Sequence, residues 1–114
     1  MKILVAGGNN SIAESVSEIL IDSGYDTTKC NIDKIDSITK QGRYDSIIFM
    51  AGNMPERNMK YIDIVRKNQP HAKIGVYTSK LFLELYDNSI KTNDCIPIEI
   101  SFKPIEETFA VLLK

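Results

Sequence analysis

The chain has 114 residues, a length that suits one domain built around one hydrophobic core. Hydrophobic residues make up 43% of it and charged residues 25%, the usual balance for a globular protein. With a formal net charge of -1 and no long basic run, the composition argues against nucleic-acid binding and against attachment to a membrane surface.

The first half of the chain alternates short apolar runs with stretches of helical periodicity. Residues 2–6 form a largely apolar run rich in branched side chains, which predicts a strand buried on both faces, and residues 7–10 interrupt it. A helix is predicted over 12–20, a weaker strand over 25–30 and a short helix over 32–38. The expected apolar positions of these helices are Ile12, Val16, Ile19, Leu20, Ile32, Ile35 and Ile38, with stops at Gly24 and near Gly42.

The second half repeats this alternation. The strongest strand prediction covers residues 45–51, and a helix with Met59, Ile62 and Val65 on its apolar face follows and ends before Pro70. The remaining predictions are a strand over 73–77, a helix over 79–87, a strand over 96–102 and a last helix from Pro104 through Ile105, Phe109 and Leu112.

Five strand–helix pairs predict a single α/β domain over residues 1–114, with a parallel sheet covered by helices on both faces. In such sheets, ligands bind beyond the carboxyl ends of the strands, near the point where the strand order reverses. A site is therefore expected in the loops at Gly7, Gly52, Thr78 and Lys103.

Reactive side chains are few and scattered. Cys30 and Cys95 lie far apart, without a CxxC pair or a partner histidine, so we expect two reduced thiols and no metal site. His71 stands alone after Pro70 and is expected on the surface. The apolar run at residues 3–6 is too short for a signal peptide or a membrane span, which favours a cytoplasmic protein.

Five short motifs occur along the chain in a fixed order. They are Lys2–Ala6 with two glycines and Asn9, Glu18–Leu20 with Gly24 and Tyr25, Tyr44-Asp45 with Met54-Pro55, Val76–Ser79, and Phe102–Pro104. In order and spacing they make the chain resemble the receiver domains of response regulators in two-component signalling, over essentially its whole length. The resemblance implies a flavodoxin-like (βα)5 three-layer sandwich with the parallel strand order 2-1-3-4-5.

The chain departs from this family where the family's chemistry takes place. The acidic pair that holds Mg²⁺ in receivers falls on Gly7 and Gly8. The phosphoacceptor aspartate falls on Met50 or on Ala51, depending on the side from which the third strand is counted. The switch aromatic of the family falls on Ile100.

These replacements remove the groups that aspartyl phosphorylation requires. Mg²⁺ prefers carboxylate oxygens, and phosphoryl transfer to a protein needs a nucleophile and a metal that neutralises the developing charge. Of the remnant pocket, Thr78 and Lys103 keep the residue types that contact the phosphoryl group in receivers. We therefore expect a pseudo-receiver without catalytic residues, metal or cofactor, which is not an enzyme and acts through protein–protein interaction.

A second hypothesis is a small anion- or nucleotide-binding sensor. Gly8, Asn9, Asn53, Thr78 and Lys103 are its candidate contacts, because glycine-rich turns at helix N-termini bind anions. The structural alternative is that the glycines form a tight turn and a helix cap, that Thr78 satisfies a backbone group, and that Lys103 precedes a cis proline.

A third hypothesis is a truncated dinucleotide binder. Residues 6–13 resemble the glycine motif of short-chain dehydrogenases, and Ala51-Gly52 weakly resembles a second motif of that family. However, the chain is less than half as long as a typical dehydrogenase and places no Tyr-x-x-x-Lys pair where catalysis would need it.

The last third of the chain carries more apolar residues than one core face uses. In receivers, the fourth helix, fifth strand and fifth helix commonly make dimer and partner contacts. The resemblance therefore implies contact with a protein partner or a homodimer here, whereas wide burial of a short helix is the alternative. The candidate interface residues are Leu81, Phe82, Leu85, Tyr86 and Phe109.

Overall fold

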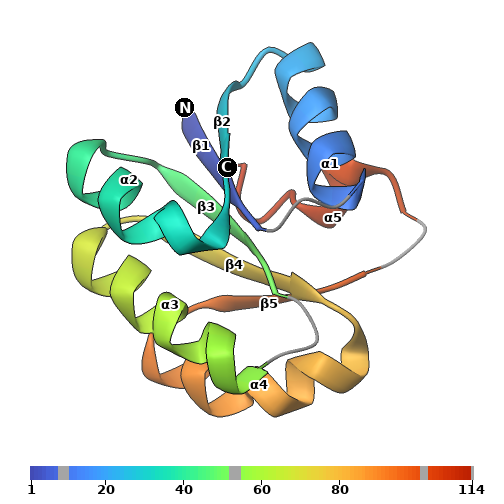
Figure 1. Ribbon diagram of the computed structural model, residues 1–114. Helices are drawn as coiled ribbons and strands as arrows, with labels where there is room; N and C mark the ends of the chain where they lie inside the picture. Colours follow the sequence, from blue (N-terminus) through green and yellow to red (C-terminus); the bar gives the residue numbers. More distant parts are fainter. Residues whose placement is uncertain (8–10, 52–54, 101–102, 114) are drawn as a thin grey trace.

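The computed structural model describes residues 1–7, 11–51, 55–100 and 103–113. They form a five-stranded parallel sheet in the order β2-β1-β3-β4-β5, with helices on both faces (Figure 1). The strands are β1 (Lys2–Ala6), β2 (Asp26–Cys30), β3 (Ser46–Met50), β4 (Lys73–Thr78) and β5 (Ile96–Glu99). The helices are α1 (Ser11–Asp22), α2 (Ile35–Gln41), α3 (Pro55–Asn68), α4 (Lys80–Thr92) and α5 (Ile105–Thr108), with a 3-10 turn, η1 (Ile32–Lys34), before α2. The predicted fold class and strand order are confirmed.

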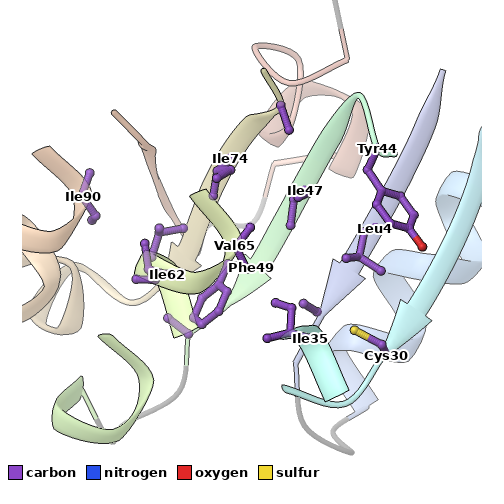
Figure 2. Close-up of a cluster of buried hydrophobic side chains, with 14 of the residues drawn as sticks. Leu4, Cys30, Ile35, Tyr44, Ile47, Phe49, Ile62, Val65, Ile74 and Ile90 are labelled. Atoms are coloured by element: carbon purple, nitrogen blue, oxygen red, sulfur yellow. The ribbon is translucent and has the colours of Figure 1, made fainter. Parts of the chain in front are cut away.

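Each face of the sheet carries its own core, because successive side chains of a strand point to opposite faces. Helices α2, α3 and α4 cover one face, and α1 and α5 cover the other (Figure 1). Figure 2 shows the first core, which includes Leu4, Ile47, Phe49 and Ile74 from the strands and Ile35, Ile62, Val65 and Ile90 from the helices. The second core includes Ile3, Val5 and Ile48 from the strands and Val16, Leu20, Phe109 and Leu112 from the α1 and α5 side.

The parallel register brings the carboxyl ends of the strands together along one edge, here called the carboxyl edge. Ala6 pairs with Phe49, Met50 with Tyr77, and Thr78 with Glu99. The residues that follow the strands therefore lie next to one another. The opposite end of the sheet, where the strands begin, is called the amino edge.

The C-terminal segment is tied closely to the sheet. Phe109 and Leu112 are fully buried, and the Ser46 hydroxyl donates a hydrogen bond of 2.6 Å to the Leu112 carbonyl. At Gly75 in β4, a Cβ atom would lie 2.5 Å from Leu112 Cδ1 and 2.7 Å from Ile98 Cδ1. Glycine at this position therefore lets the last turn approach the sheet, and this contact fixes α5 beside β4 and β5.

Three element boundaries differ from the sequence predictions. Helix α4 continues past Asp87 to Thr92, whereas α5 ends at Thr108 instead of running through Leu112. After Thr108 the backbone tightens, since the Leu112 N–H bonds to the Phe109 carbonyl three residues back. Strand β5 ends at Glu99, and residues 101–102 of the predicted strand lie outside the described residues.

In α1, the core-facing side also differs in part from the expectation. Val16 and Leu20 are buried as predicted, but Ile12 and Ile19 are exposed, because Ala13 takes the remaining core position. In the described part of the chain, none of the helices combines the length and apolar character needed to cross a membrane.

Candidate functional site at the carboxyl edge and β5

The carboxyl edge centres on a contact between Gly7 and Met50. Gly7 follows β1 and donates its N–H to the Cys30 carbonyl at 3.1 Å, while Met50 ends β3 and is only 7% exposed. A Cβ atom at Gly7 would lie 2.6 Å from Met50 Cβ and 3.0 Å from Met50 Cγ. Met50 therefore occupies the space that any side chain at position 7 would need.

Ala51 lies differently from Met50. Its N–H points to the Tyr77 carbonyl at 3.1 Å and the Phe49 carbonyl at 3.0 Å. Ala51 belongs to the core beneath α2, α3 and α4, whereas Met50 belongs to the core beneath α1 and α5. Of the two candidate positions for a phosphoacceptor, Met50 is the one that faces Gly7.

The other residues predicted for the pocket do not form an anion-binding site within the described part of the chain. Thr78 is buried, and its carbonyl accepts the Ile100 N–H at 3.0 Å. Lys103 is exposed and lines a groove beside Glu99 and Glu107. No cis peptide bond occurs within the described segments, so the cis bond before Pro104, one structural alternative for Lys103, is absent. Gly8, Asn9 and Asn53, the other candidate anion contacts, lie outside the described residues.

The two cysteines are neutral thiols at ordinary pH. Burial raises the pKa of Cys30 to about 11, with a smaller contribution from the Asp33 carboxylate. Burial also raises the pKa of Cys95 to about 11, against the opposing effect of the Arg66 guanidinium. Both thiols are free, as predicted, and their protonated form is a poor nucleophile and metal ligand. His71 is exposed, also as predicted, and no cluster of three potential metal ligands exists among the described residues.

The predicted interface divides into surface and core residues. Leu81 is 66% and Leu85 50% exposed on α4, while Phe82 is half-buried against the first core. Tyr86 and Phe109, in contrast, are fully buried, so their assignment to an interface is wrong.

Both buried aromatic residues have internal partners. Asn58 Nδ2 donates to the Tyr86 hydroxyl at 3.2 Å, between α3 and α4. The Phe109 ring meets the Tyr77 ring edge-to-face, with 5.1 Å between the ring centroids. These contacts hold helices on the sheet and leave neither ring available to a partner.

Two grooves flank the edge strand β5. The first, the α4–β5 groove, has a volume of about 320 Å³ and is lined by Lys80, Leu83, Glu84, Asp87, Ile90 and Pro97. The second, the β5–α5 groove, has a volume of about 290 Å³ and is lined by Pro97, Ile98, Glu99, Lys103, Glu107, Thr108 and Val111. Pro97 lines both grooves.

Comparison with known proteins finds likeness in structure alone. No protein-family model and no curated protein matches the chain. Among solved structures, the chemotaxis protein CheY4 of Vibrio cholerae superposes with a TM-score of 0.79, over 98% of this chain and 95% of that one, at 22% identity. A response regulator of Burkholderia pseudomallei with a phosphorylated aspartic acid gives 0.78 at 18% identity, over 97% of this chain and 65% of that one. A CheY-like protein, TadZ, of Pseudomonas aeruginosa gives a TM-score of 0.71 at 8% identity, over 99% of this chain and 98% of that one.

The fold is that of CheY-like receiver domains. At these low identities the likeness extends to the arrangement of the strands and helices. The groups that line the carboxyl edge have to be taken from this chain itself.

Within this receiver-like fold, the sequence reasoning missed the residues of the two grooves. Glu84 and Ile90 come together with Pro97 only because α4 packs beside β5. One signal was present, since a proline within a strand indicates an edge strand. The groove residues on α4, on α5 and after α5, including Val111, carried no comparable local signal.

Proposed function

We propose that the chain is a receiver-like signalling module that is not phosphorylated on aspartate and acts through protein–protein contact. The contact between Gly7 and Met50 carries this proposal. It puts a thioether and a glycine where the resemblance to receivers calls for carboxylates.

The chemistry of these residues supports the proposal. A thioether sulfur is a weak, soft acceptor and glycine has no side chain, whereas Mg²⁺ selects hard oxygen ligands. Replacing Gly7 by an aspartate would in addition push a Cβ atom into Met50. A single substitution would therefore not rebuild an acidic pocket, because both sides of the contact must change together.

The proposal is tested by incubating the chain with Mg²⁺ and acetyl phosphate and measuring its intact mass. We expect no added phosphoryl group, while the B. pseudomallei response regulator, treated in parallel, serves as the positive control. Mg²⁺ with beryllofluoride should also leave the melting temperature unchanged, since a ligand that binds only the folded state must raise it. A mass increase that is stable in acid and lies on another residue type would not bear on the proposal. An aspartyl phosphate would contradict it.

The contact surface that we propose consists of α4, β5 and α5, with the exposed Leu81 and Leu85 of α4 and the two grooves that flank β5. Exposed leucines and a mainly apolar α4–β5 groove suit a protein partner better than a nucleic acid or a lipid surface. We also propose, from the composition, that the module works in the cytoplasm and is not an enzyme.

The anion-sensor hypothesis finds less support. Lys103, its only described cation, lies among Glu99 and Glu107, whose carboxylates compete with an anion for its charge. A thermal-shift series with phosphate and nucleotides would restore the sensor hypothesis if one of these ligands alone stabilised the chain.

A further inference from the structure

We infer that the partner presents a cationic, partly apolar segment, which lies across Pro97 with side chains in both grooves beside β5. This inference rests on the proposed protein-contact function and specifies the chemistry of the partner. Its basis is the shape and charge of the two grooves and the position of Pro97 between them.

The two grooves differ in polarity. The α4–β5 groove is mainly apolar, with Leu83 and Ile90 of α4 as its floor, whereas the β5–α5 groove is more polar and has Ile98 and Val111 as its apolar part. Val111 is 47% exposed, so this apolar surface is open to a partner. At about 320 and 290 Å³, each groove lies at the lower limit of pockets that hold organic ligands, a size suited to individual side chains.

The rims of the grooves are acidic. Each groove has two carboxylates and one lysine, so the six lining charges sum to -2, and the patch stays net negative when Lys91, which pairs with Asp87 at 3.0 Å, is counted as well. All six side chains belong to exposed residues, where charge governs steering and choice of partner more than raw affinity. The carboxylates are Glu84, Asp87, Glu99 and Glu107, and the lysines are Lys80 and Lys103. A lysine- or arginine-bearing segment complements this pattern, with its apolar side chains on the apolar parts of the two grooves.

The same features argue against a second copy of the chain as the occupant. A symmetric dimer would bring the same patch of both copies face to face, and hence two net negative surfaces. Like-signed surfaces disfavour association by several kcal/mol when charges lie close together.

Pro97 also argues against a partner that extends the sheet. β5 is an edge strand of four residues, and proline has no N–H to donate to an added strand. Strand addition depends on main-chain hydrogen bonds, which this short edge supplies poorly. The partner segment is therefore recognised through its side chains, by the apolar parts and the acidic rims of the two grooves.

The inference is tested by fluorescence anisotropy with a labelled peptide of alternating lysine and leucine, and with a matched glutamate–leucine peptide. We expect binding of the lysine peptide only, weakening as salt is added. The variant Glu84→Lys/Glu99→Lys should lose about tenfold or more in affinity, because one carboxylate per groove is reversed.

A control variant separates the grooves from the overall charge of the molecule. Asp26→Lys/Asp33→Lys changes the net charge by the same amount on exposed positions of β2, which is the edge strand opposite β5, and of η1, which follows β2. Its affinity should fall by less than about threefold, as expected for distant, screened charges. Circular dichroism melting would establish that both variants fold.

Three results would overturn the inference. Equal losses in both variants would mean a general charge effect, and preference for the glutamate peptide would reverse the predicted chemistry. Sedimentation that shows a dimer, abolished by Val111→Asp, would make a second copy the occupant. None of these results affects the mass measurement, so failure of the inference and failure of the proposed function are distinguishable.

Discussion

The two edges of the sheet are built on different principles. At the amino edge, Arg66 in the last turn of α3 and Gln69 just after it hold neighbouring loops through buried and partly buried hydrogen bonds, whereas at the carboxyl edge Met50 packs against Gly7. In doubly wound folds, the carboxyl edge is where ligands bind. Among the residues that the structure describes, the hydrogen-bond network of Arg66 and Gln69 lies at the opposite edge.

Gln69 is the centre of the amino edge. It is 2% exposed, and its Nε2 donates to the Thr39 and Gly42 carbonyls, both at 2.6 Å. Its Oε1 accepts the Tyr44 N–H at 3.1 Å. One side chain therefore satisfies three backbone groups from the end of α2 and the start of β3.

Arg66 performs a similar role one turn away. Its Nε donates to the Asn93 carbonyl at 2.7 Å and its Nη1 to the Ala72 carbonyl at 2.8 Å. The same guanidinium reaches the carbonyls of Pro70 and Asp94 at 3.1 and 3.2 Å. It thus joins the loops that lead into β4 and β5.

The contrast shows that the two edges are held by different kinds of contact. Among the described residues, every buried side-chain nitrogen and oxygen has a hydrogen-bond partner. The tight polar network preserves the receiver-like fold at the amino edge. At the carboxyl edge, Met50 instead belongs to the apolar core beneath α1 and α5.

The largest expected effect comes from removing the hydrogen bonds of Gln69 at the amino edge. Gln69→Leu leaves three buried backbone groups without partners, at about 1–3 kcal/mol each, so we expect a loss of at least about 3 kcal/mol. Urea unfolding measures this loss. The control Gln41→Leu changes an exposed glutamine of α2 and should alter stability by less than about 0.5 kcal/mol. Similar losses of stability in both variants would contradict the contrast drawn between the two edges of the sheet.

The second prediction tests how tightly the carboxyl edge is packed. Gly7→Ala places a Cβ atom 2.6 Å from Met50 Cβ, and overpacking of this kind costs about 1–3 kcal/mol. Gly42→Ala is the matched control, because its Cβ would meet the Tyr44 ring at an ordinary 3.5 Å and its φ is negative. That variant should be neutral or slightly stabilised. A fully stable Gly7→Ala protein would show that Met50 can move aside.

The third prediction concerns geometry rather than charge at the amino edge. Arg66→Lys keeps the positive charge but loses the planar set of donors, so we expect a loss of about 1–2 kcal/mol in urea unfolding. Lys67→Arg, at the exposed neighbouring position, should have almost no effect. An unchanged stability of Arg66→Lys would mean that a point charge is sufficient.

The smallest expected effect concerns the two cysteines, one at each edge of the sheet. Cys30 ends β2 at the carboxyl edge, and Cys95 lies just before β5 at the amino edge. Burial raises the pKa of both thiols from 9.0 to about 11, so the unfolded chain releases these protons first. Stability should therefore be complete below pH 9.0 and decline as the pH rises towards about 11. The decline should be smaller in Cys30→Ala/Cys95→Ala, as followed by urea unfolding at each pH. Burial raises the tyrosine pKa of Tyr44, Tyr77 and Tyr86 as well, and so a residual decline is expected.

Sequence patterns predicted the layout of the domain because periodicity and turn residues act locally. The strand over 45–51 and the helix that follows it were both found at the predicted places. The same reasoning failed on α4, where it assigned Tyr86 to the surface. A helix rich in apolar residues has no local mark that separates its core side from an exposed side bearing Leu81 and Leu85.

For this protein, the sequence alone determined the order of the elements and the absence of a carboxylate at Gly7 and at Met50, since residue type and spacing suffice for both. Tertiary structure decided that these two residues touch and that Gln69 joins α2 to β3. It also decided that Pro97 separates two acidic grooves. Each of these features joins residues distant in the chain, and their distance and direction are fixed only when the helices pack on the sheet.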